Sequence, residues 1–239
     1  MIWLLWLFRV FEVLLTRAHG LSLRNISAKW KNLLVHMTIL KASEPYILTF
    51  LYRMMSSAKK SSWNMGLVNS MHDPALLFIS TDLGVVIRDK YPKARHHFLV
   101  LPKSDIPSIY HVKRKDLSLL YELHLLAVNV IEILGMKTDD FKIGFHALPS
   151  MQRLHLHVIS TDFISSCLKT KKHWNSFNTE LFLDYEYVRN EIEVNGSLRR
   201  IDKQKASELS AKELKCNQCN HVASNMPNLK SHLLVHSKR

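Results

Sequence analysis

Four potential metal ligands near the end of the chain constrain the fold more than any other feature of the sequence. Cys216 and Cys219 are separated by two residues, and after a gap of twelve residues His232 and His236 follow. A tight turn can present the cysteines and one face of a helix the histidines, because positions i and i+4 lie one above the other. Two thiolates and two imidazoles at this spacing are typical of a tetrahedral structural zinc site. The sequence therefore predicts a small zinc-stabilised domain over residues 211–239.

This pattern resembles the common two-Cys two-His zinc finger. Leu229, three residues before His232, occupies the place of the apolar residue that a short finger needs in its centre. Ala223 stands where that family usually has an aromatic residue, so we expect a weaker miniature core. All four coordination positions would be filled by protein, which leaves no open position for a catalytic water. The alternative is a chance coincidence of two cysteines and two histidines.

The composition favours one main domain with a polyanionic partner. A chain of 239 residues can form one sizeable core plus the small metal-binding unit. Lys and Arg number 33 against 20 Asp and Glu, a formal charge of +13 that attracts nucleic acid. Solubility alone is the weaker explanation of this charge. With two cysteines assigned to zinc, only Cys167 remains, which excludes a disulfide framework and indicates a reducing compartment.

Residues 1–62 form an extension to which we assign no folded domain. Its apolar run from Met1 to Phe8 is interrupted by Arg9 and Glu12, well short of the roughly twenty residues that span a bilayer. No basic segment precedes the run, as a secretory signal would require. We therefore expect no membrane partner. The extension is poor in acids and contains Arg, which is typical of organellar presequences, but a poorly ordered extension is an equal alternative.

From residue 63 onward, the sequence predicts an α+β domain over 63–183, with a connecting helix and linker over 184–210. Short strands are expected over 75–80, 85–88 and 97–101, and the last ends at Pro102, which has no N–H for the ladder. Apolar residues at three- and four-residue steps predict a helix over 116–134 that Gly135 closes. Further strands are expected over 141–148 and 154–160. Strands joined mainly by short turns, with one long helix, indicate an antiparallel sheet with helices.

The last predicted strand carries the candidate chemistry. Alternation places three apolar side chains on its core face and three basic ones on the other: Leu154, Leu156 and Val158 against Arg153, His155 and His157. Three basic groups on one face repel one another unless they meet an anion. A neutral imidazole, whose ordinary pKa is about 6.5, also offers a nucleophilic nitrogen near pH 7. The pattern predicts a site for phosphate chemistry, with two surface histidines on an edge strand as the alternative.

Residues 63–239 resemble a known family. The run from Arg153 to Ile159 is similar to the His-x-His-x-His signature of the histidine triad nucleotide hydrolases and transferases, and residues 89–102 are similar to their preceding segment. Within that superfamily, residues 145–151, 162–163 and 171–180, followed by a finger, resemble the aprataxin family of DNA-adenylate hydrolases. The resemblance implies the histidine triad fold and a substrate in which AMP is attached to a DNA 5′ end.

The resemblance also implies roles for individual residues. His155 would attack the α-phosphorus to give a histidyl-AMP intermediate, which water would then hydrolyse. His157 and His146 would assist, the latter as an acid or leaving-group contact. The other implied contacts are Ser150, Met151, Lys172, His97, Asp89 and Leu67 with phosphate or nucleotide, and Trp63, Lys171, Trp174 and Lys230 with DNA.

Trp63, Leu67 and Met71 would share one face of a helix, because they stand four residues apart. Core packing is the favoured role of Leu67 and Met71. Trp63 could instead stack on a terminal base pair.

Two features depart from the family pattern. Arg153 replaces the first histidine of the triad, a position that supports the middle imidazole largely through its backbone carbonyl, which Arg also has. Because Arg is larger and always charged, we expect it to tighten phosphate binding and to slow release of the intermediate, so that Arg153→His raises turnover. Residues 1–62 do not resemble the forkhead-associated domain of vertebrate members, so binding to phosphorylated scaffolds is not expected.

Three functional classes therefore compete. They are a DNA-adenylate hydrolase acting on nicked or broken ends, with RNA–DNA junctions as a further substrate, a small-molecule triad hydrolase, and a nucleic-acid-binding protein with weakened catalysis. The finger and the charge argue against the second class, and the intact His155 and His157 against the third. The first class implies single-strand break repair in the nucleus, or in the mitochondrion if residues 1–62 are a presequence.

Overall fold

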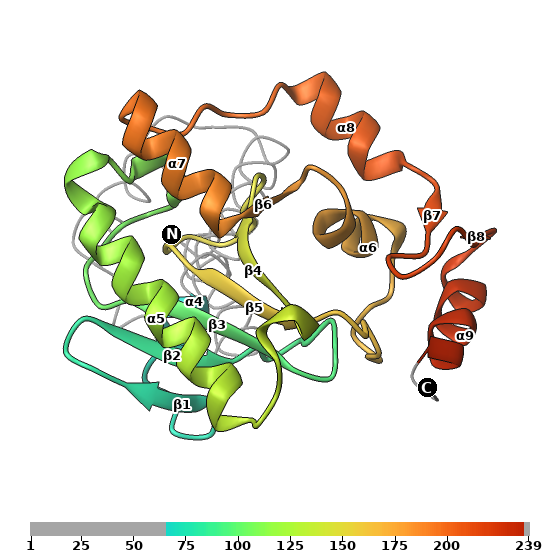
Figure 1. Cartoon of the computed structure of the whole chain (residues 1–239), viewed down its shortest axis with the longest axis horizontal. Helices are drawn as coiled ribbons and strands as arrows, with labels where there is room; N and C mark the ends of the chain where they lie inside the picture. Colours follow the sequence, from blue (N-terminus) through green and yellow to red (C-terminus); the bar gives the residue numbers. More distant parts are fainter. Residues whose placement is uncertain (1–65, 237–239) are drawn as a thin grey trace, which may run out of the picture. The chain divides into compact units, whose positions relative to one another are not determined.

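The computed structural model describes residues 66–236, and its main element is a six-stranded antiparallel sheet (Figure 1). In spatial order the strands are β1 (Leu77–Ser80), β2 (Gly84–Arg88), β3 (His97–Pro102), β5 (Leu156–Ser160), β4 (Phe141–His146) and β6 (Phe182–Asp184). Every neighbouring pair is antiparallel, which confirms the predicted sheet. β5 lies between β3 and β4, so the strand with the candidate chemistry is internal and not at an edge.

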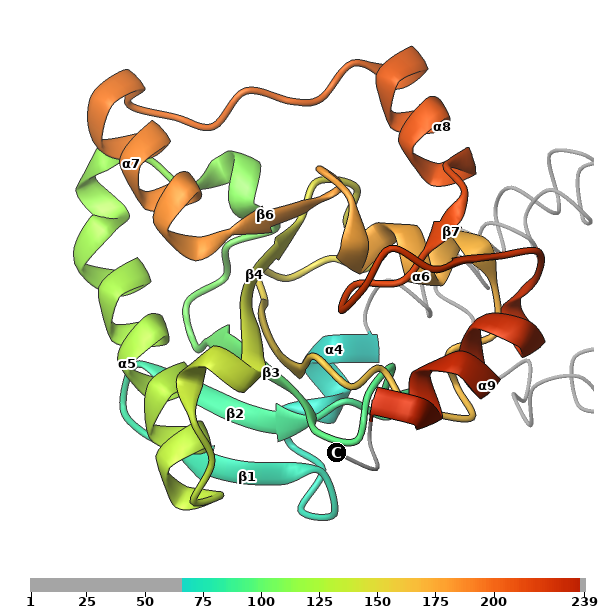
Figure 2. The ribbon, with the colours of Figure 1, turned by 45° about the vertical axis from the view of Figure 1, so that its right-hand side comes forward.

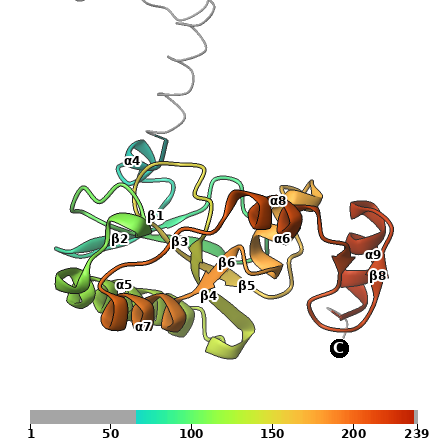
Figure 3. The same cartoon turned by 90° about the horizontal axis from the view of Figure 1, so that it is seen from above.

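Two helices cover one face of the sheet. α5 (Leu117–Ile133) and α7 (Tyr185–Asn195) lie side by side there, on the side opposite α4 (Gly66–Ser70) (Figure 3). Gly135, at φ 67°, follows α5 in the left-handed conformation that its sequence predicts. The core between helices and sheet includes Val86, Phe98, Val100, Leu120, Leu123, Val130, Leu156, Val158, Val188 and Ile192.

The other face of the sheet is covered in part by α4 and the turn that follows it. Leu67 and Met71 are buried there, as their spacing predicts, with apolar residues of β2 and β3. Trp63 and the extension 1–62 lie outside the described residues. Within 66–236, no helix has both the length and the hydropathy that a membrane crossing requires.

The segment predicted as a connecting helix and linker contains two helices. α7 packs on the main core, and α8 (Lys203–Ala211) leads toward the finger (Figure 2). Asp184 and Asp202 cap α7 and α8, because their carboxylates accept hydrogen bonds from the free N–H groups of the first turns. Short 3-10 helices occupy Ile109–His111, Arg114–Asp116 and Thr138–Asp140.

The C-terminal finger consists of β7 (Leu214–Lys215), β8 (Val222–Ala223) and α9 (Met226–His236). Leu229 is fully buried, as predicted for its central position. The finger does not depend on a core of its own, because its apolar residues join those of the larger domain. This shared core contains Leu214, Ala223, Met226, Leu229 and Leu233 together with Phe163, Leu168, Trp174 and Phe177.

Trp174 of α6 (Lys171–Asn178) is the largest side chain of this shared core. Its exposed fraction is 1 %, and its indole Nε1 donates a hydrogen bond to the Lys215 carbonyl at 3.1 Å. The neighbouring Asn175 donates to the carbonyls of Ser210 and Lys212. The expectation that Trp174 contacts DNA is therefore wrong. Trp174 supplies, from outside the finger, the aromatic packing that Ala223 lacks.

Substitution of Leu123 tests the core described above. Leu123 is fully buried in α5, so Leu123→Ala removes apolar contacts and is expected to lower the free energy of unfolding by about 2 to 5 kcal/mol. Leu125→Ala on the same helix is the matched control, because Leu125 is 43 % exposed, and should cost less than about 1 kcal/mol. Urea unfolding measures both. Equal losses would contradict the assignment of the buried face.

Candidate active site and metal centre

Four histidines meet on the sheet face opposite α5 and α7. His97 lies in β3, His146 ends β4, His157 lies in β5, and His155 directly precedes β5. The ring centroid of His157 is 4.3 Å from that of His146, 4.9 Å from His155 and 5.3 Å from His97. The structure thus brings together the four histidines singled out in the sequence.

One hydrogen bond fixes the protonation of His155. Its Nδ1 lies 2.8 Å from the backbone carbonyl of Arg153. A carbonyl can only accept, so Nδ1 carries the proton, and the neutral ring keeps its lone pair on Nε2. The hydrogen bond to the main chain therefore leaves the Nε2 of His155 able to act as a nucleophile.

A second chain of hydrogen bonds fixes His97 and His157. The backbone N–H of Lys93 donates to His97 Nδ1 at 3.2 Å, so the His97 proton lies on Nε2. That Nε2 lies 3.0 Å from His157 Nδ1, which must accept. The His157 proton is then on Nε2, a buried atom with no hydrogen-bond partner within residues 66–236. An unpartnered N–H is a donor available to a phosphate oxygen.

Asp89 is a charged neighbour of His97: burial lowers the pKa of this ring, and the Asp89 carboxylate opposes that shift in part. Its Oδ2 lies 3.4 Å from His97 Nδ1, the atom that also receives the Lys93 N–H. Because a backbone N–H cannot accept, we assign Nδ1 as the acceptor and regard the carboxylate as an electrostatic neighbour. The other oxygen of Asp89 accepts from the Tyr91 N–H at 2.7 Å. A ribose contact by Asp89 stays a prediction.

Burial keeps the four histidines neutral. It lowers the pKa of His97 to about 4 and that of His146 to about 3, and it also lowers the pKa values of His155 and His157. Near pH 7 the cluster therefore offers neutral rings with N–H groups and contains no imidazolium.

Lys93 is the cation whose charge further lowers the pKa values of His97, His146 and His157. Sequence reasoning did not select it, although it lies in the segment 89–95 that resembles the family. Lys171 and Lys172 are exposed in the first turn of α6, and Lys230 is half-buried in α9. Their contacts with phosphate or DNA stay predictions.

Arg153 does not share a strand face with His155 and His157. β5 begins at Leu156, and Arg153 has a positive φ of 97°, which ends the alternation. Its guanidinium donates to the Asp105 carboxylate and to the Lys103 carbonyl, each at 2.8 Å. The expectation of three basic side chains on one face is therefore wrong for Arg153. What the structure retains is the role of its backbone carbonyl.

A small pocket lies beside His155 and His146. Its lining residues are Ser108, Ile109, Phe145, His146, Pro149, Arg153, Leu154 and His155. Ser150 and Met151 follow Pro149 in the chain; Ser150 is exposed, and Met151 packs against the cluster that contains Leu67. Contacts of Ser150, Met151 and Leu67 with phosphate or nucleotide stay predictions.

Two phenylalanines form an aromatic wall around the histidines. Phe177 of α6 has its ring centroid 4.5 Å from His146 and 5.5 Å from His157, and Phe182 of β6 lies 5.9 Å from His146. Gly144 of β4 makes room for this wall, because a Cβ there would lie 2.7 Å from the Phe182 ring. No periodic pattern in the sequence indicates these two residues, because they come from separate elements.

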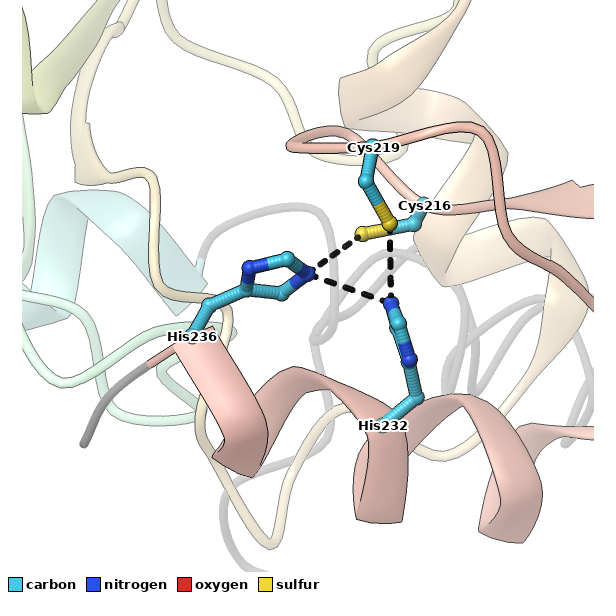
Figure 4. A group of neighbouring side chains, drawn as sticks. All are labelled: Cys216, Cys219, His232 and His236. Carbon is cyan, nitrogen blue, oxygen red and sulfur yellow. Dashed lines mark hydrogen bonds between the residues drawn. The ribbon is translucent and has the colours of Figure 1, made fainter. Parts of the chain in front are cut away.

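The predicted zinc ligands converge in the finger (Figure 4). Cys216 and Cys219 come from the β7–β8 turn, and His232 and His236 from α9. The two Nε2 atoms are 3.1 Å apart, and the Sγ–Nε2 distances are 3.2 Å for Cys219–His232 and 3.5 Å for Cys216–His236. Zinc bonds of about 2.0 Å to nitrogen and 2.3 Å to sulfur imply tetrahedral edges of roughly 3.3 to 3.8 Å. All four ligand atoms lie within 4.8 Å of one another, so the four residues have the donor set and the approximate arrangement of a zinc site.

The turn between the two cysteines also contacts the strand of the histidines. The side-chain amides of Asn217 and Gln218 donate to the Thr161 carbonyl at 2.8 Å and 3.4 Å. Thr161 directly follows the last residue of β5. The metal centre and the histidine cluster are thus attached to the same strand.

Comparison with known proteins places this architecture in a family. A model described as scavenger mRNA decapping enzyme C-term binding matches residues 62–173, and one described as a C2HE / C2H2 / C2HC zinc-binding finger matches residues 178–239. An aprataxin-like protein of Saccharomyces cerevisiae is 31% identical over 72% of this chain and 94% of its own length. The chain belongs to the aprataxin family.

Animal relatives are more similar in sequence but longer. An aprataxin-like protein of Drosophila melanogaster is 58% identical over 73% of this chain, which spans 26% of that relative. The aprataxin of Gallus gallus is 46% identical over 73% of this chain, which spans 55% of it.

Crystal structures of aprataxin orthologues named Hnt3 share the fold. One is in complex with DNA, with a TM-score of 0.60 and 22% identity over 75% of this chain and 94% of that chain. Another, from Schizosaccharomyces pombe, has a TM-score of 0.58 and 22% identity over 72% of this chain and 89% of its own. The predicted histidine triad fold with a C-terminal finger is therefore confirmed.

Loss of the metal should disturb both the finger and the end of β5. We expect one zinc per chain in the unmodified protein and none in Cys219→Ser, because structural zinc supplies folding free energy. His221→Ala is the matched control, since His221 stacks on His232 but is not one of the four ligands. Elemental analysis measures the zinc, and amide hydrogen exchange should increase over 214–236 and at 161–163 in Cys219→Ser alone. Unchanged exchange in that variant would contradict the coupling.

The buried histidines should make stability depend on pH. Their lowered pKa values mean that unfolding takes up protons below about pH 6.5, so the stabilisation is complete above that pH and is lost as the pH falls towards 4 and 3. We expect urea unfolding to show a falling free energy between pH 7 and 5, by up to about 1.4 kcal/mol per pH unit for each titrating histidine. His146→Phe should reduce the slope. Greater stability at pH 5 than at pH 7 would refute this assignment.

Proposed function

We propose that this protein is a hydrolase that removes AMP from adenylated 5′ ends of DNA. The observation that carries the proposal is the fixed tautomer of His155, whose Nδ1 donates to the Arg153 carbonyl and leaves Nε2 free to attack. Membership of the aprataxin family supports the choice of substrate.

The proposed reaction has two steps. His155 Nε2 forms a bond to the α-phosphorus of the adenylate, the anhydride bond breaks, and the DNA leaves with its 5′-phosphate. Water then attacks the histidyl-AMP phosphorus, which releases AMP and restores the imidazole. His157 Nε2–H and the Lys93 charge would stabilise the non-bridging oxygens, because phosphoryl transfer depends mainly on positioning and charge.

His146 fits a leaving-group contact better than a general acid. Burial lowers its pKa to about 3, so its ring is neutral near pH 7. A departing phosphate monoester has a second pKa of about 6 and needs no added proton at that pH. A neutral N–H contact to the bridging oxygen is therefore sufficient.

The DNA side of the proposal rests on charge and on a relative. The orthologue of similar fold was crystallised with DNA, and the charge of +13 favours polyanions. Lys171, Lys172 and Lys230 would contact phosphates. A single finger reads only about three base pairs, so we propose that it strengthens binding without selecting sequence. RNA–DNA junctions as further substrates, and single-strand break repair in the nucleus, belong to the same proposal.

A second candidate substrate is a dinucleoside polyphosphate. The match of residues 62–173 to the decapping-enzyme model favours it, because a cap also joins two nucleosides through phosphoanhydride bonds. The same nucleophile would serve either substrate.

Replacement of His155 tests the proposal. We expect the unmodified protein to release AMP from adenylated nicked DNA, and His155→Ala to lower the rate at least about 10³-fold while DNA affinity is retained, because the nucleophile is lost and the phosphate contacts remain. AMP release and equilibrium binding are measured on the same duplex. His72→Ala is the control, since His72 is an exposed histidine of the same domain.

Two outcomes would contradict the proposal. Near-normal turnover by His155→Ala would exclude the covalent mechanism. Cleavage of a dinucleoside polyphosphate with no AMP release from adenylated DNA would favour the second candidate.

A further inference from the structure

We propose that Asp105 and the Arg153 side chain form a clamp that positions the nucleophile. The clamp holds the Arg153 carbonyl against His155 Nδ1 and thereby fixes the His155 tautomer. The inference rests on the proposed function for the identity of the reaction, but not for the geometry that it describes.

The segment 103–107 forms hydrogen bonds with the backbone N–H groups of Arg153 and Leu154 and with the side chain of Arg153. The Arg153 N–H donates to the Pro107 carbonyl at 3.0 Å, and the Leu154 N–H donates to the Ile106 carbonyl at 2.7 Å. The Arg153 guanidinium reaches back over the same segment to Asp105 and Lys103. The peptide that carries the Arg153 carbonyl is thus held on both sides.

The backbone conformation explains why such a grip is needed. Arg153 has φ 97°, a region that side chains with a Cβ rarely adopt. A residue in this region relaxes towards negative φ unless its surroundings hold it. Relaxation would rotate the Arg153 carbonyl away from His155 Nδ1, so the contacts of the side chain act on the catalytic ring through the main chain.

The length of the side chain suits this task. Arg presents several N–H donors in a planar fork, and here Nη1 reaches a carboxylate while Nη2 reaches a carbonyl. The shorter imidazole of a histidine lacks that fork. We therefore reverse the expectation from the sequence: Arg153→His should lower turnover and not raise it.

The two hydrogen-bond acceptors of the guanidinium, the Asp105 carboxylate and the Lys103 carbonyl, hold it with different strength. Arg153 has a 13 % exposed side chain, whereas Asp105 is 87 % exposed, so their ion pair is screened by solvent and salt. The hydrogen bond to the Lys103 carbonyl does not depend on Asp105. Loss of Asp105 should therefore have a smaller effect than loss of the Arg153 side chain.

One atom of Arg153 distinguishes this role from phosphate binding. Its Nε is buried without a hydrogen-bond partner within the described part of the chain, and Arg153 lines the pocket beside His155. A direct contact from Nε to substrate would appear in KM. A positioning role would appear in kcat and in the state of the His155 ring.

The experiment compares Arg153→Ala, Arg153→His, Asp105→Asn and the double variant Asp105→Asn/Arg153→Ala with the unmodified protein. Asp82→Asn is the control, since Asp82 is an exposed aspartate in the turn between β1 and β2. Imidazole nitrogen NMR reports the fraction of His155 with its proton on Nδ1. Release of AMP from adenylated nicked DNA gives kcat, KM and their pH dependence.

We expect Arg153→Ala to lower the Nδ1–H fraction and to reduce kcat about 10- to 100-fold with KM unchanged. Asp105→Asn should reduce kcat about threefold and should add nothing in the Arg153→Ala background. The hydrogen bond to the Arg153 carbonyl raises the pKa of His155, so its loss should move the acid limb of the kcat profile to lower pH.

Several results would overturn the clamp. A higher KM with unchanged kcat in Arg153→Ala would show that Arg153 binds substrate directly. Faster turnover of Arg153→His would show that Arg153 slows the reaction relative to a histidine at this position. Additive effects of Asp105→Asn and Arg153→Ala on kcat would show that the two residues act independently. If the unmodified protein releases no AMP, the proposed function fails, while the NMR measurement still decides the positioning role. Asp105→Asn, at an exposed position, keeps the test valid if Arg153→Ala does not fold.

Discussion

The hydrogen bond from His155 Nδ1 to the Arg153 carbonyl is the interaction on which the candidate site depends. It determines which ring nitrogen of His155 carries the proton, because a carbonyl oxygen can only accept a hydrogen bond. The fold supplies what this bond requires: β5 is internal between β3 and β4, and the segment 103–107 holds the peptide before it. His155, which lines a small pocket, thereby has its lone pair on Nε2.

Burial gives the same cluster its electrostatic character. Enclosed by Phe177 and Phe182, the rings lose the solvent that would stabilise a charge, and their pKa values fall. The network through Lys93 and His97 then places a proton on His157 Nε2 without any net charge. The cluster therefore offers neutral N–H donors beside one ammonium group, that of Lys93, a combination that suits a phosphate group.

The strands β1 to β5, the helix α5 and the four zinc ligands could be predicted because each follows from a local pattern: alternation, three- and four-residue steps, or ligand spacing. The strand β6 and the helix α6 were not predicted. The conformation of Arg153 could not be predicted, because alternation assumes an extended strand and nothing in an Arg residue indicates a positive φ. For Trp174 the family resemblance implied a DNA contact, yet the helix turns this side chain towards the finger. Lys93 also acts through space on the rings of His146 and His157, which are distant in sequence, so this role could be seen only in the tertiary structure.

The finger is best understood as part of the structure that supports the histidines. Trp174 joins its core to α6, the helix that also presents Phe177 to the rings of His146 and His157. The turn between the zinc-binding cysteines holds the Thr161 carbonyl at the end of β5. One connection ends at the residue that follows β5, and the other at the helix whose Phe177 packs against His146 and His157. We therefore expect zinc bound in the finger, although it has no open coordination position, to stabilise β5 and α6 beside the histidine cluster.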